Sequence, residues 1–307
     1  MSQPRIAVFA RLANGNVAPM GTIEGQKTNL SRTMHGIVFD SIHDEIIVPV
    51  ALAGAVLVFK GDARGETAPI RVIQGPKTQM IRPHTVTVDP VNNEIIVGDR
   101  SARALMVYSR TANGDVAPLR VIQGDKTQLL DLVGVAVDYK RNVLIASNTD
   151  RVSDRTGLFF YNRTDNGNVA PIRFVGGPKS GIIRTWQIEA NSDLGKVYVA
   201  AINNDYLAPY RLEKARDGLD PNIDIPGPWN TDKHVGFIGV WDTLDNGDVP
   251  PQTQIKGYST LVAHPGGVAI NVKDSEIYVT DSVRNGLLAF LIPEAFRPST
   301  GVPSAGR

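Results

Sequence analysis

The stretch TANGDVAPLRVIQGDKT (residues 111–127) decides the fold, because copies of it recur along the whole chain. Each copy holds a turn and then a short apolar run. In each copy a proline such as Pro118 is followed six residues later by a glycine such as Gly124. Repetition of this kind predicts a repeat architecture in which every copy supplies the same structural unit. The copies begin at Leu12, Asp62, Thr111, Thr164, Ala215 and Leu244.

A second repeated unit lies between these copies, for example TVTVDPVNNEIIVGD (residues 85–99). Its first half alternates apolar and polar residues, a polar turn follows, and the second half is rich in β-branched residues, which predicts two paired strands. A third strand follows at residues 104–109, and the Asn-Gly turn leads into a fourth. Four strands in roughly 50 residues, with almost no helical pattern, predict an all-β fold, a β-propeller of four-stranded blades. A solenoid of parallel coils competes with it, but Asn-Gly hairpins favour antiparallel strands.

The spacing of the repeats bears on the number of blades. The motif prolines are separated by 50, 49, 53 and 50 residues, and then by only 30. The short interval holds a single strand pair, residues 234–242 and 252–256. We therefore predict six sectors with one abbreviated blade, in a ring closed by N-terminal strands from residues 5–25. Five blades with an extra hairpin on the rim are the alternative. In either case residues 1–296 form one propeller domain and residues 297–307 a C-terminal tail.

The composition narrows the class of partner. Thirty-two basic and 31 acidic residues give the 307-residue chain a formal charge of +1, which offers no reason to expect nucleic acid or an acidic membrane. Cysteine is absent, so disulfides, thiol catalysis and thiolate ligands are excluded. No run is apolar enough for a membrane helix, and no signal peptide is visible. We expect a soluble monomer, cytoplasmic or a processed periplasmic form, that binds a small-molecule substrate or a peptide.

Two stretches, VGDRSARALMVY (residues 97–108) and VTDSVRNGLLAF (residues 279–290), resemble the repeats of NHL-type propellers. In that family an aspartate ends the second strand, a short basic loop follows, and the apolar third strand ends in an aromatic residue. The resemblance covers nearly the whole chain as a repeat pattern. It implies a group of six-bladed proteins that includes peptidylglycine amidating lyase, strictosidine synthase-like proteins and gluconolactonase-like hydrolases. Because these proteins do different things, the fold alone does not give the function.

Histidines gather where a propeller usually binds its ligand. The first strand of each blade lines the central channel, and the loops at one end of these strands converge. His35 and His84 hold equivalent positions just before two inner strands, while His43 lies in a turn elsewhere. Since neutral imidazole binds zinc, copper or iron, we expect a transition metal at the axis. Its predicted ligands are His35, His84, His234 and His264.

The resemblance to the amidating lyase likewise implies a metal held by three histidines at the axis. The competing interpretation is that each histidine hydrogen-bonds a loop carbonyl. Asp99 and Asp281 end matched strands, so we expect them to orient a histidine or to act as general base. An aspartate at a strand end also commonly caps its own turn. The predicted substrate-binding residues are Arg100, Arg184, Trp186 and Arg284.

Two hypotheses of function follow. The first is a metal-dependent enzyme that acts on a small organic molecule by lyase, hydrolytic or oxidative chemistry. The alternative is a non-catalytic NHL-type propeller that binds a protein or peptide on its loop-rich face. A lactonase-like hydrolase on carboxylate-bound calcium would need acidic and asparagine ligands where histidines stand.

Overall fold

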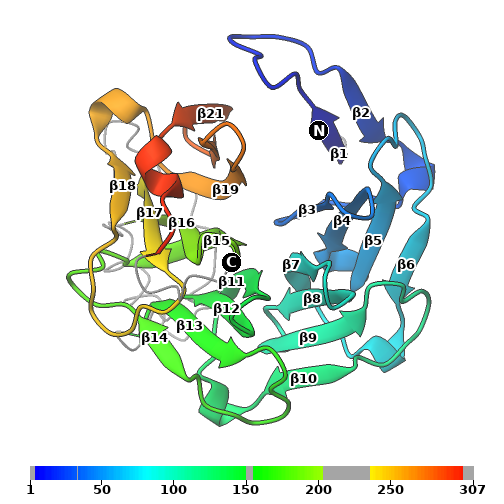
Figure 1. Ribbon diagram of the computed structural model, residues 1–307. Helices are drawn as coiled ribbons and strands as arrows, with labels where there is room; N and C mark the ends of the chain where they lie inside the picture. The colour runs from blue at the N-terminus through cyan, green and yellow to red at the C-terminus, as the bar shows by residue number, and fades with distance from the viewer. Residues whose placement is uncertain (1–3, 33, 150–154, 203–235, 300–307) are drawn as a thin grey trace, which may run out of the picture. The chain divides into compact units, whose positions relative to one another are not determined.

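The computed structural model describes residues 4–32, 34–149, 155–202 and 236–299 of the chain. These residues form antiparallel sheets joined by short 3₁₀ helices (Figure 1). None of the helices in these ranges is long and apolar enough to cross a membrane. The chain divides into two compact units, residues 1–124 with 166–168, and residues 125–165 with 169–307.

The first unit holds a two-stranded sheet and two complete four-stranded sheets, all antiparallel. The two-stranded sheet is β1 (Arg5–Val8) and β2 (Gly21–Glu24). The first complete sheet is β3 (Val38–Asp40), β4 (Glu45–Val50), β5 (Ala55–Lys60) and β6 (Arg71–Gln74). The second is β7 (Pro83–Asp89), β8 (Glu94–Asp99), β9 (Ala104–Ser109) and β10 (Arg120–Gln123).

The second unit holds two four-stranded sheets and one three-stranded sheet. They are β11 (Leu132–Asp138), β12 (Val143–Asn148), β13 (Gly157–Asn162) and β14 (Arg173–Val175); β15 (Arg184–Asn191), β16 (Lys196–Ile202), β17 (Gly236–Asp242) and β18 (Thr253–Lys256); and β19 (Pro265–Asn271), β20 (Glu276–Asp281) and β21 (Gly286–Leu291). The 3₁₀ helices of the described ranges are η1 (Gln26–Thr28), η2 (Ala51–Ala53), η3 (Pro76–Thr78), η4 (Asp125–Thr127), η5 (Tyr258–Thr260) and η6 (Pro293–Phe296).

The prediction of an all-β propeller is confirmed, and the described residues form five blades, which is the alternative to six sectors. The prediction of an abbreviated blade is wrong. β17 pairs with β16 from Lys196↔Asp242 to Ile202↔Gly236, and β18 pairs with β17, so these strands complete the blade that β15 begins. In the sequence residues 203–235 stand between the second and third strands of this blade, and they disturbed the spacing of the repeats on which the prediction relied.

Two further predictions about the ends of the chain remain predictions. β1 and β2 pair with each other from Arg5↔Glu24 to Val8↔Gly21, and β19–β21 form a three-stranded sheet. Closure by the N-terminal strands and a single domain over residues 1–296 therefore rest on the sequence pattern. The predicted tail begins attached to the second unit, because Ser299 donates hydrogen bonds to the carbonyls of Leu194 and Gly195.

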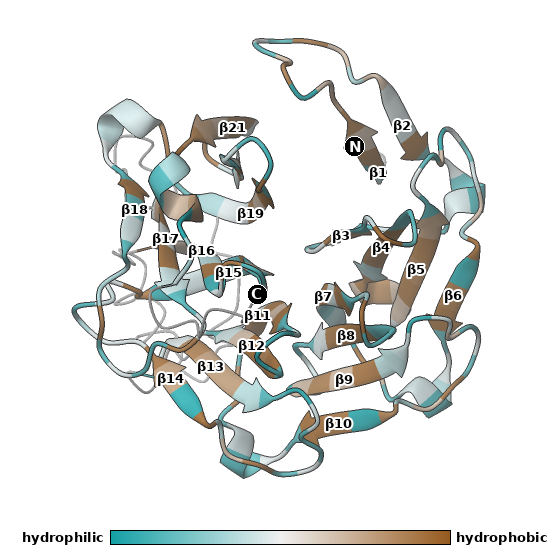
Figure 2. Cartoon of the chain, viewed as in Figure 1, coloured by the Kyte–Doolittle hydropathy of each residue, from teal (hydrophilic) through white to brown (hydrophobic). Residues whose placement is uncertain are grey.

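The middle strands of the four-stranded sheets are buried along nearly their whole length, and most of their residues are apolar. In the first unit Ile47, Val56 and Val58 of one blade pack with Ile95 and Val97 of the next. Figure 2 shows β5 and β9 as largely hydrophobic. A fully buried aliphatic side chain contributes roughly 1.5–3 kcal/mol, so this contact between blades is a main source of stability.

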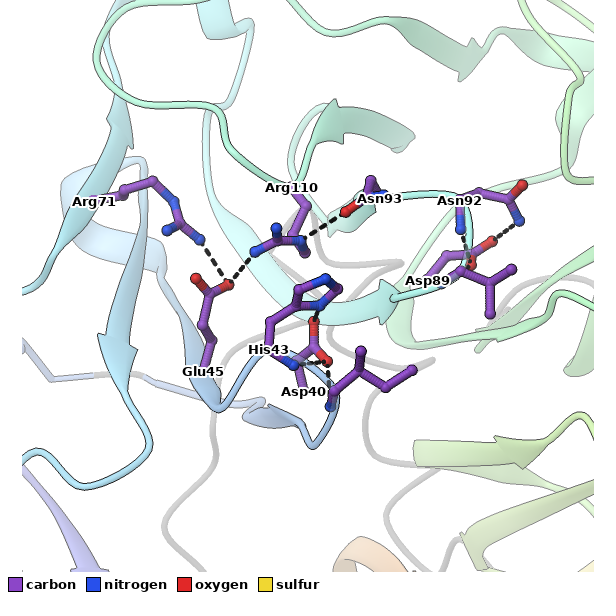
Figure 3. Close-up of polar contacts among 10 residues, drawn as sticks. Asp40, His43, Glu45, Arg71, Asp89, Asn92, Asn93 and Arg110 are labelled. Atoms are coloured by element: carbon purple, nitrogen blue, oxygen red, sulfur yellow. Dashed lines mark hydrogen bonds and ion pairs between the residues drawn. The ribbon is translucent and has the colours of Figure 1, made fainter.

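In three blades a buried aspartate, Asp40, Asp89 or Asp138, holds the turn between the first and second strands, and Figure 3 shows the first two. Asp40 accepts the N–H groups of Ile42 and His43 and contacts His43 Nδ1 at 2.7 Å. In the next blade Asp89 accepts a bond from the Asn92 side chain at the matching position. The His43 side chain thus contacts the turn aspartate of its own repeat, as Asn92 does in the next. Its predicted place in a turn, away from the starts of the inner strands, agrees with this contact.

A second polar contact in Figure 3 joins neighbouring blades of the first unit. Glu45 accepts hydrogen bonds from Arg71 of its own blade at 2.7 Å and from Arg110 of the next at 3.0 Å. Burial acts to raise the pKa of Glu45, but the hydrogen bonds and charges of the two arginines outweigh it and lower the pKa below its usual value. The carboxylate therefore stays charged and links the blades.

Candidate functional site

The predicted site residues lie at one end of the inner strands, in both units. The first unit contains His35 before β3, His84 in β7, and Asp99 and Arg100 at the end of β8. The second unit contains the larger set: Arg184 and Trp186 in β15, His264 before β19, Asp281 at the end of β20, and Arg284 in the loop that follows. His234 lies outside the described residues.

His35 and His84 are in direct contact, as their equivalent positions suggested. Their ring centroids are 4.2 Å apart and their planes differ by 11°, so the exposed ring of His35 stacks on the buried ring of His84. His84 is 5% exposed. A metal ion lies in the plane of each imidazole that binds it, about 2 Å from the nitrogen. Because the two ring planes are inclined by only 11°, the stacked rings lie nearly parallel and do not point to one ion in this arrangement.

The described part of the chain contains no group of three or more His, Asp and Glu side chains able to hold a metal ion. The histidine-bound metal therefore stays a prediction from sequence. The pair instead forms a flat stacked surface, of the kind that contributes about 0.5–1.5 kcal/mol between aromatic rings beyond the area they bury.

Asp99 and Asp281 hold the loops around them through both carboxylate oxygens. Asp281 Oδ2 accepts the N–H groups of Ala263 and His264 at 2.8 and 2.7 Å. Its Oδ1 accepts those of Val283 and Arg284, both at 3.0 Å. Asp99 acts in the same way: its Oδ2 accepts the N–H groups of Ile81 and Arg82 before β7, and its Oδ1 accepts those of Ser101 and Ala102 after β8. The geometry thus gives both aspartates a positioning role, and Asp281 fixes the backbone of His264.

Four of the five inner strands, β7, β11, β15 and β19, contain a register shift near their start, which takes the residues there out of the regular alternation. The residue at the shift is His84 in β7, Val133 in β11 and Gly266 in β19. In β15 the shift lies further along, between Thr185 and Ile188, so that Trp186 and Gln187 share it. Such bulges are frequent beside functional sites because they redirect side chains. Sequence alignment of the repeats placed Thr185 at this position and missed the displacement.

Trp186 is the centre of a cluster in the second unit. The Arg184 guanidinium carbon lies 4.4 Å from the Trp186 ring centroid, a cation–π contact. The ring of His264 approaches the same indole at 5.8 Å between centroids, with an interplanar angle of 60°. His264 Nδ1 lies 3.0 Å from Ser282 Oγ, in the loop after β20. The cluster brings a cation, an aromatic ring and an imidazole together from two neighbouring inner strands and one loop.

The backbone beneath Trp186 is held from the neighbouring blade. Ser147 Oγ donates to the Trp186 carbonyl at 2.7 Å, and a Cβ at Gly134 would stand 2.7 Å from the same oxygen. A side chain at Gly134 would therefore displace Trp186. The indole N–H of Trp186 is enclosed and has no acceptor among the residues that the structure describes. Leaving such a buried donor unsatisfied costs about 1–3 kcal/mol.

Glu189 is a titratable group of this region that the sequence did not single out. It lies in β15, and its Oε2 accepts the N–H of Ile270 in β19 at 3.0 Å. Burial raises the pKa of Glu189 to about 7 from its usual 4.5, and the Ile270 bond offsets this only in part. Its carboxylate in turn contributes, after burial, to the raised pKa of Tyr198. A glutamate in an alternating strand carries no signal in sequence that its surroundings are apolar.

A search with protein-family models found no match to this chain, and a search of the curated proteins found none either. The NHL-type resemblance therefore rests on the repeat pattern, and the site is interpreted from its own geometry.

Proposed function

We propose that this propeller binds a small organic anion, a carboxylate attached to a flat apolar group, at the cluster of Arg184, Trp186 and His264. The observation that carries the proposal is the Arg184 guanidinium stacked on the Trp186 indole at 4.4 Å. A guanidinium stacked on a ring keeps its N–H groups in its own plane, and a planar guanidinium binds a carboxylate with two parallel hydrogen bonds.

Several features support a small ligand. The residues of the cluster come from the starts of β15 and β19 and from one loop, so they span a small area. Strands that pack against each other keep the side chains in place, which lowers the entropy lost on binding. The near-neutral formal charge of the chain gives no long-range attraction for polyanions.

The test compares small aromatic carboxylates with their neutral primary amides by titration calorimetry on the whole chain. We expect carboxylates to bind at least about tenfold more tightly, because a hydrogen bond to a charged group contributes about 1.5–3 kcal/mol. Arg184→Met keeps the aliphatic stem and removes the charge, so it should abolish the preference for carboxylate. Trp186→Leu should weaken the binding of carboxylates and of amides to a similar degree.

Lys140→Met is the matched control, because it removes one exposed cation of the same unit that pairs with Asp193. Its binding should equal that of the unaltered protein. Carboxylates that bind no better than amides, or an Arg184→Met protein that keeps the preference, would overturn the proposal.

A further inference from the structure

A serine hydroxyl and an imidazole are in contact at the edge of the cluster in the second unit. Ser282 Oγ lies 3.0 Å from His264 Nδ1, and Ser282 is exposed while His264 is half-buried. Ser282 Oγ also lies 3.2 Å from the His264 carbonyl oxygen, so its hydrogen has two acceptors within reach. When the imidazole proton is on Nε2, Nδ1 is an acceptor and can take up the hydroxyl proton. The two side chains therefore have the arrangement of a nucleophile beside its general base.

Backbone contacts fix the relative position of these two residues. The Ser282 N–H donates to the His264 carbonyl at 3.1 Å, next to the pairing of Pro265 with Asp281 that joins β19 and β20. Asp281 Oδ2 accepts the N–H of His264 at 2.7 Å, and its Oδ1 accepts the N–H groups of the two residues that follow Ser282. Because these bonds involve only main-chain groups of the pair, either side chain can be replaced without removing them.

The imidazole is also packed against the ring of Trp186, at 5.8 Å between centroids. A general base acts efficiently when a third group orients it, and here the indole has that place. The Arg184 guanidinium carbon lies 4.4 Å from the centroid of the same indole. A cation, an indole, an imidazole and a hydroxyl thus follow one another across the cluster. A small molecule with a carboxylate at one end and an ester at the other matches this order.

We propose that Ser282 and His264 form a nucleophile–base pair that cleaves an ester of a small molecule bearing a carboxylate. The choice of a carboxylate at the Arg184 end rests on the proposed function. The pair itself rests on the contact between the Ser282 hydroxyl and the His264 ring, held by the backbone bonds of both residues.

The reaction has two steps, and each returns the proton that it takes. Ser282 Oγ attacks the ester carbonyl carbon and gives its proton to His264 Nδ1. The bond between that carbon and the alkoxy oxygen then breaks, the alcohol leaves with the proton from Nδ1, and the acyl group stays on Ser282. Water attacks the acyl group in the same way, and the carboxylic acid leaves as Ser282 Oγ regains its proton. The sum is ester and water to acid and alcohol, without any oxidant or reductant.

The first experiment labels the full chain with a fluorophosphonate, which reacts with activated serines by loss of fluoride, and maps the labelled peptides by mass spectrometry. Ser101 is the matched control, because it is exposed and lies in the loop after β8, which corresponds to the loop after β20. Among the described residues, no hydrogen bond joins its hydroxyl to a histidine. We expect Ser282 to be labelled at least about tenfold faster than Ser101, because a positioned general base contributes about 10²–10⁴-fold.

Variants separate the role of the base from that of exposure. His264→Gln should slow the labelling of Ser282 to about the rate of Ser101, and Ser282→Ala should remove the label from that peptide, with circular dichroism to verify the fold. A chelator is present throughout, since His264 was also predicted to bind a metal. Labelling of Ser282 that is no faster than that of Ser101, that persists in His264→Gln, or that the chelator abolishes, would overturn the proposal.

The absence of cysteine from the sequence provides a second measurement that does not depend on an ester. Ser282→Cys and Ser101→Cys each give the chain a single thiol, and alkylation by iodoacetamide measures its reactivity. We expect the thiol at position 282 to react about tenfold faster, because an adjacent imidazole favours the thiolate. Equal rates in the two variants would contradict the pairing with His264.

A third measurement distinguishes this proposal from the proposed binding function. The mono-4-nitrophenyl ester of a small dicarboxylic acid should be cleaved at least about tenfold faster than the same compound with its carboxylate methylated. Carboxylate binding in calorimetry without labelling of Ser282 would refute the nucleophile–base pair and leave the binding function intact. Labelling of Ser282 with equal cleavage of the two esters would refute the carboxylate site and leave the pair intact.

Discussion

Glu189 gives the most quantitative prediction, a loss of stability as the pH rises. The pKa of its carboxyl is about 7 in the folded protein, against the usual 4.5 that it regains on unfolding. Below about pH 4.5 the group is protonated in both states, so its contribution is fully present there. As the pH rises toward about 7 the unfolded state releases its proton first, and the folded state loses stability relative to it.

The size of the effect follows from the difference in pKa. A rise from 4.5 to about 7 corresponds to about 3 kcal/mol at most. Because Glu189 is only half-buried, solvent at its exposed part reduces this toward about 2 kcal/mol. With a urea dependence of about 2 kcal/mol per molar, the unfolding midpoint should fall by about 1 M across this window.

Glu189→Gln removes the titration and keeps an oxygen that can accept the Ile270 N–H. The variant should lack this fall and should be more stable than the unaltered protein above neutral pH. Urea unfolding across the pH window, followed by circular dichroism, measures both. Glu294→Gln removes an exposed carboxylate from the same unit and should leave the fall in place. Equal pH dependence in the unaltered protein and in Glu189→Gln would show that this carboxyl is not in an apolar environment.

Three further predictions concern the turns and the inner-strand entrances. His43→Asn should keep the stability of its turn, because Asn92 fills the same role beside Asp89, while His43→Leu should cost about 1–2 kcal/mol of unfolding free energy in urea. Asp281→Ala should cost about 3 kcal/mol because it leaves backbone N–H groups without their acceptor. Asp281→Asn should cost less, and equal losses in the two variants would contradict the loop-holding role. Elemental analysis of tag-free protein should find no transition metal lost on His35→Ala/His84→Ala, and a full equivalent lost in this variant would refute the stacked arrangement.

The sequence predicted where along the chain the residues of the candidate site lie, but not how their side chains are oriented toward one another. The repeats located the starts of the inner strands, and His35 and His84 do meet there. Spacing in sequence does not set the angle between two rings, however, and the structure shows these two rings stacked. Trp186 and Arg184 were expected to bind substrate, and the structure brings them together with His264. The displaced bulge in β15 that centres this cluster has no sequence signal, because it depends on how β15 pairs with β16.

By itself, the sequence determined the blade. A four-stranded antiparallel unit requires local features: alternating apolar residues, Asn-Gly turns and the glycine that follows each motif proline. Each of these features can be recognised within one repeat. Which strands complete which blade, and how two carboxylates come to accept hydrogen bonds from backbone N–H groups, were decided only by the tertiary structure. These features depend on partners far apart in the chain, and a pattern within one repeat contains no information about a neighbour that folding alone brings into contact.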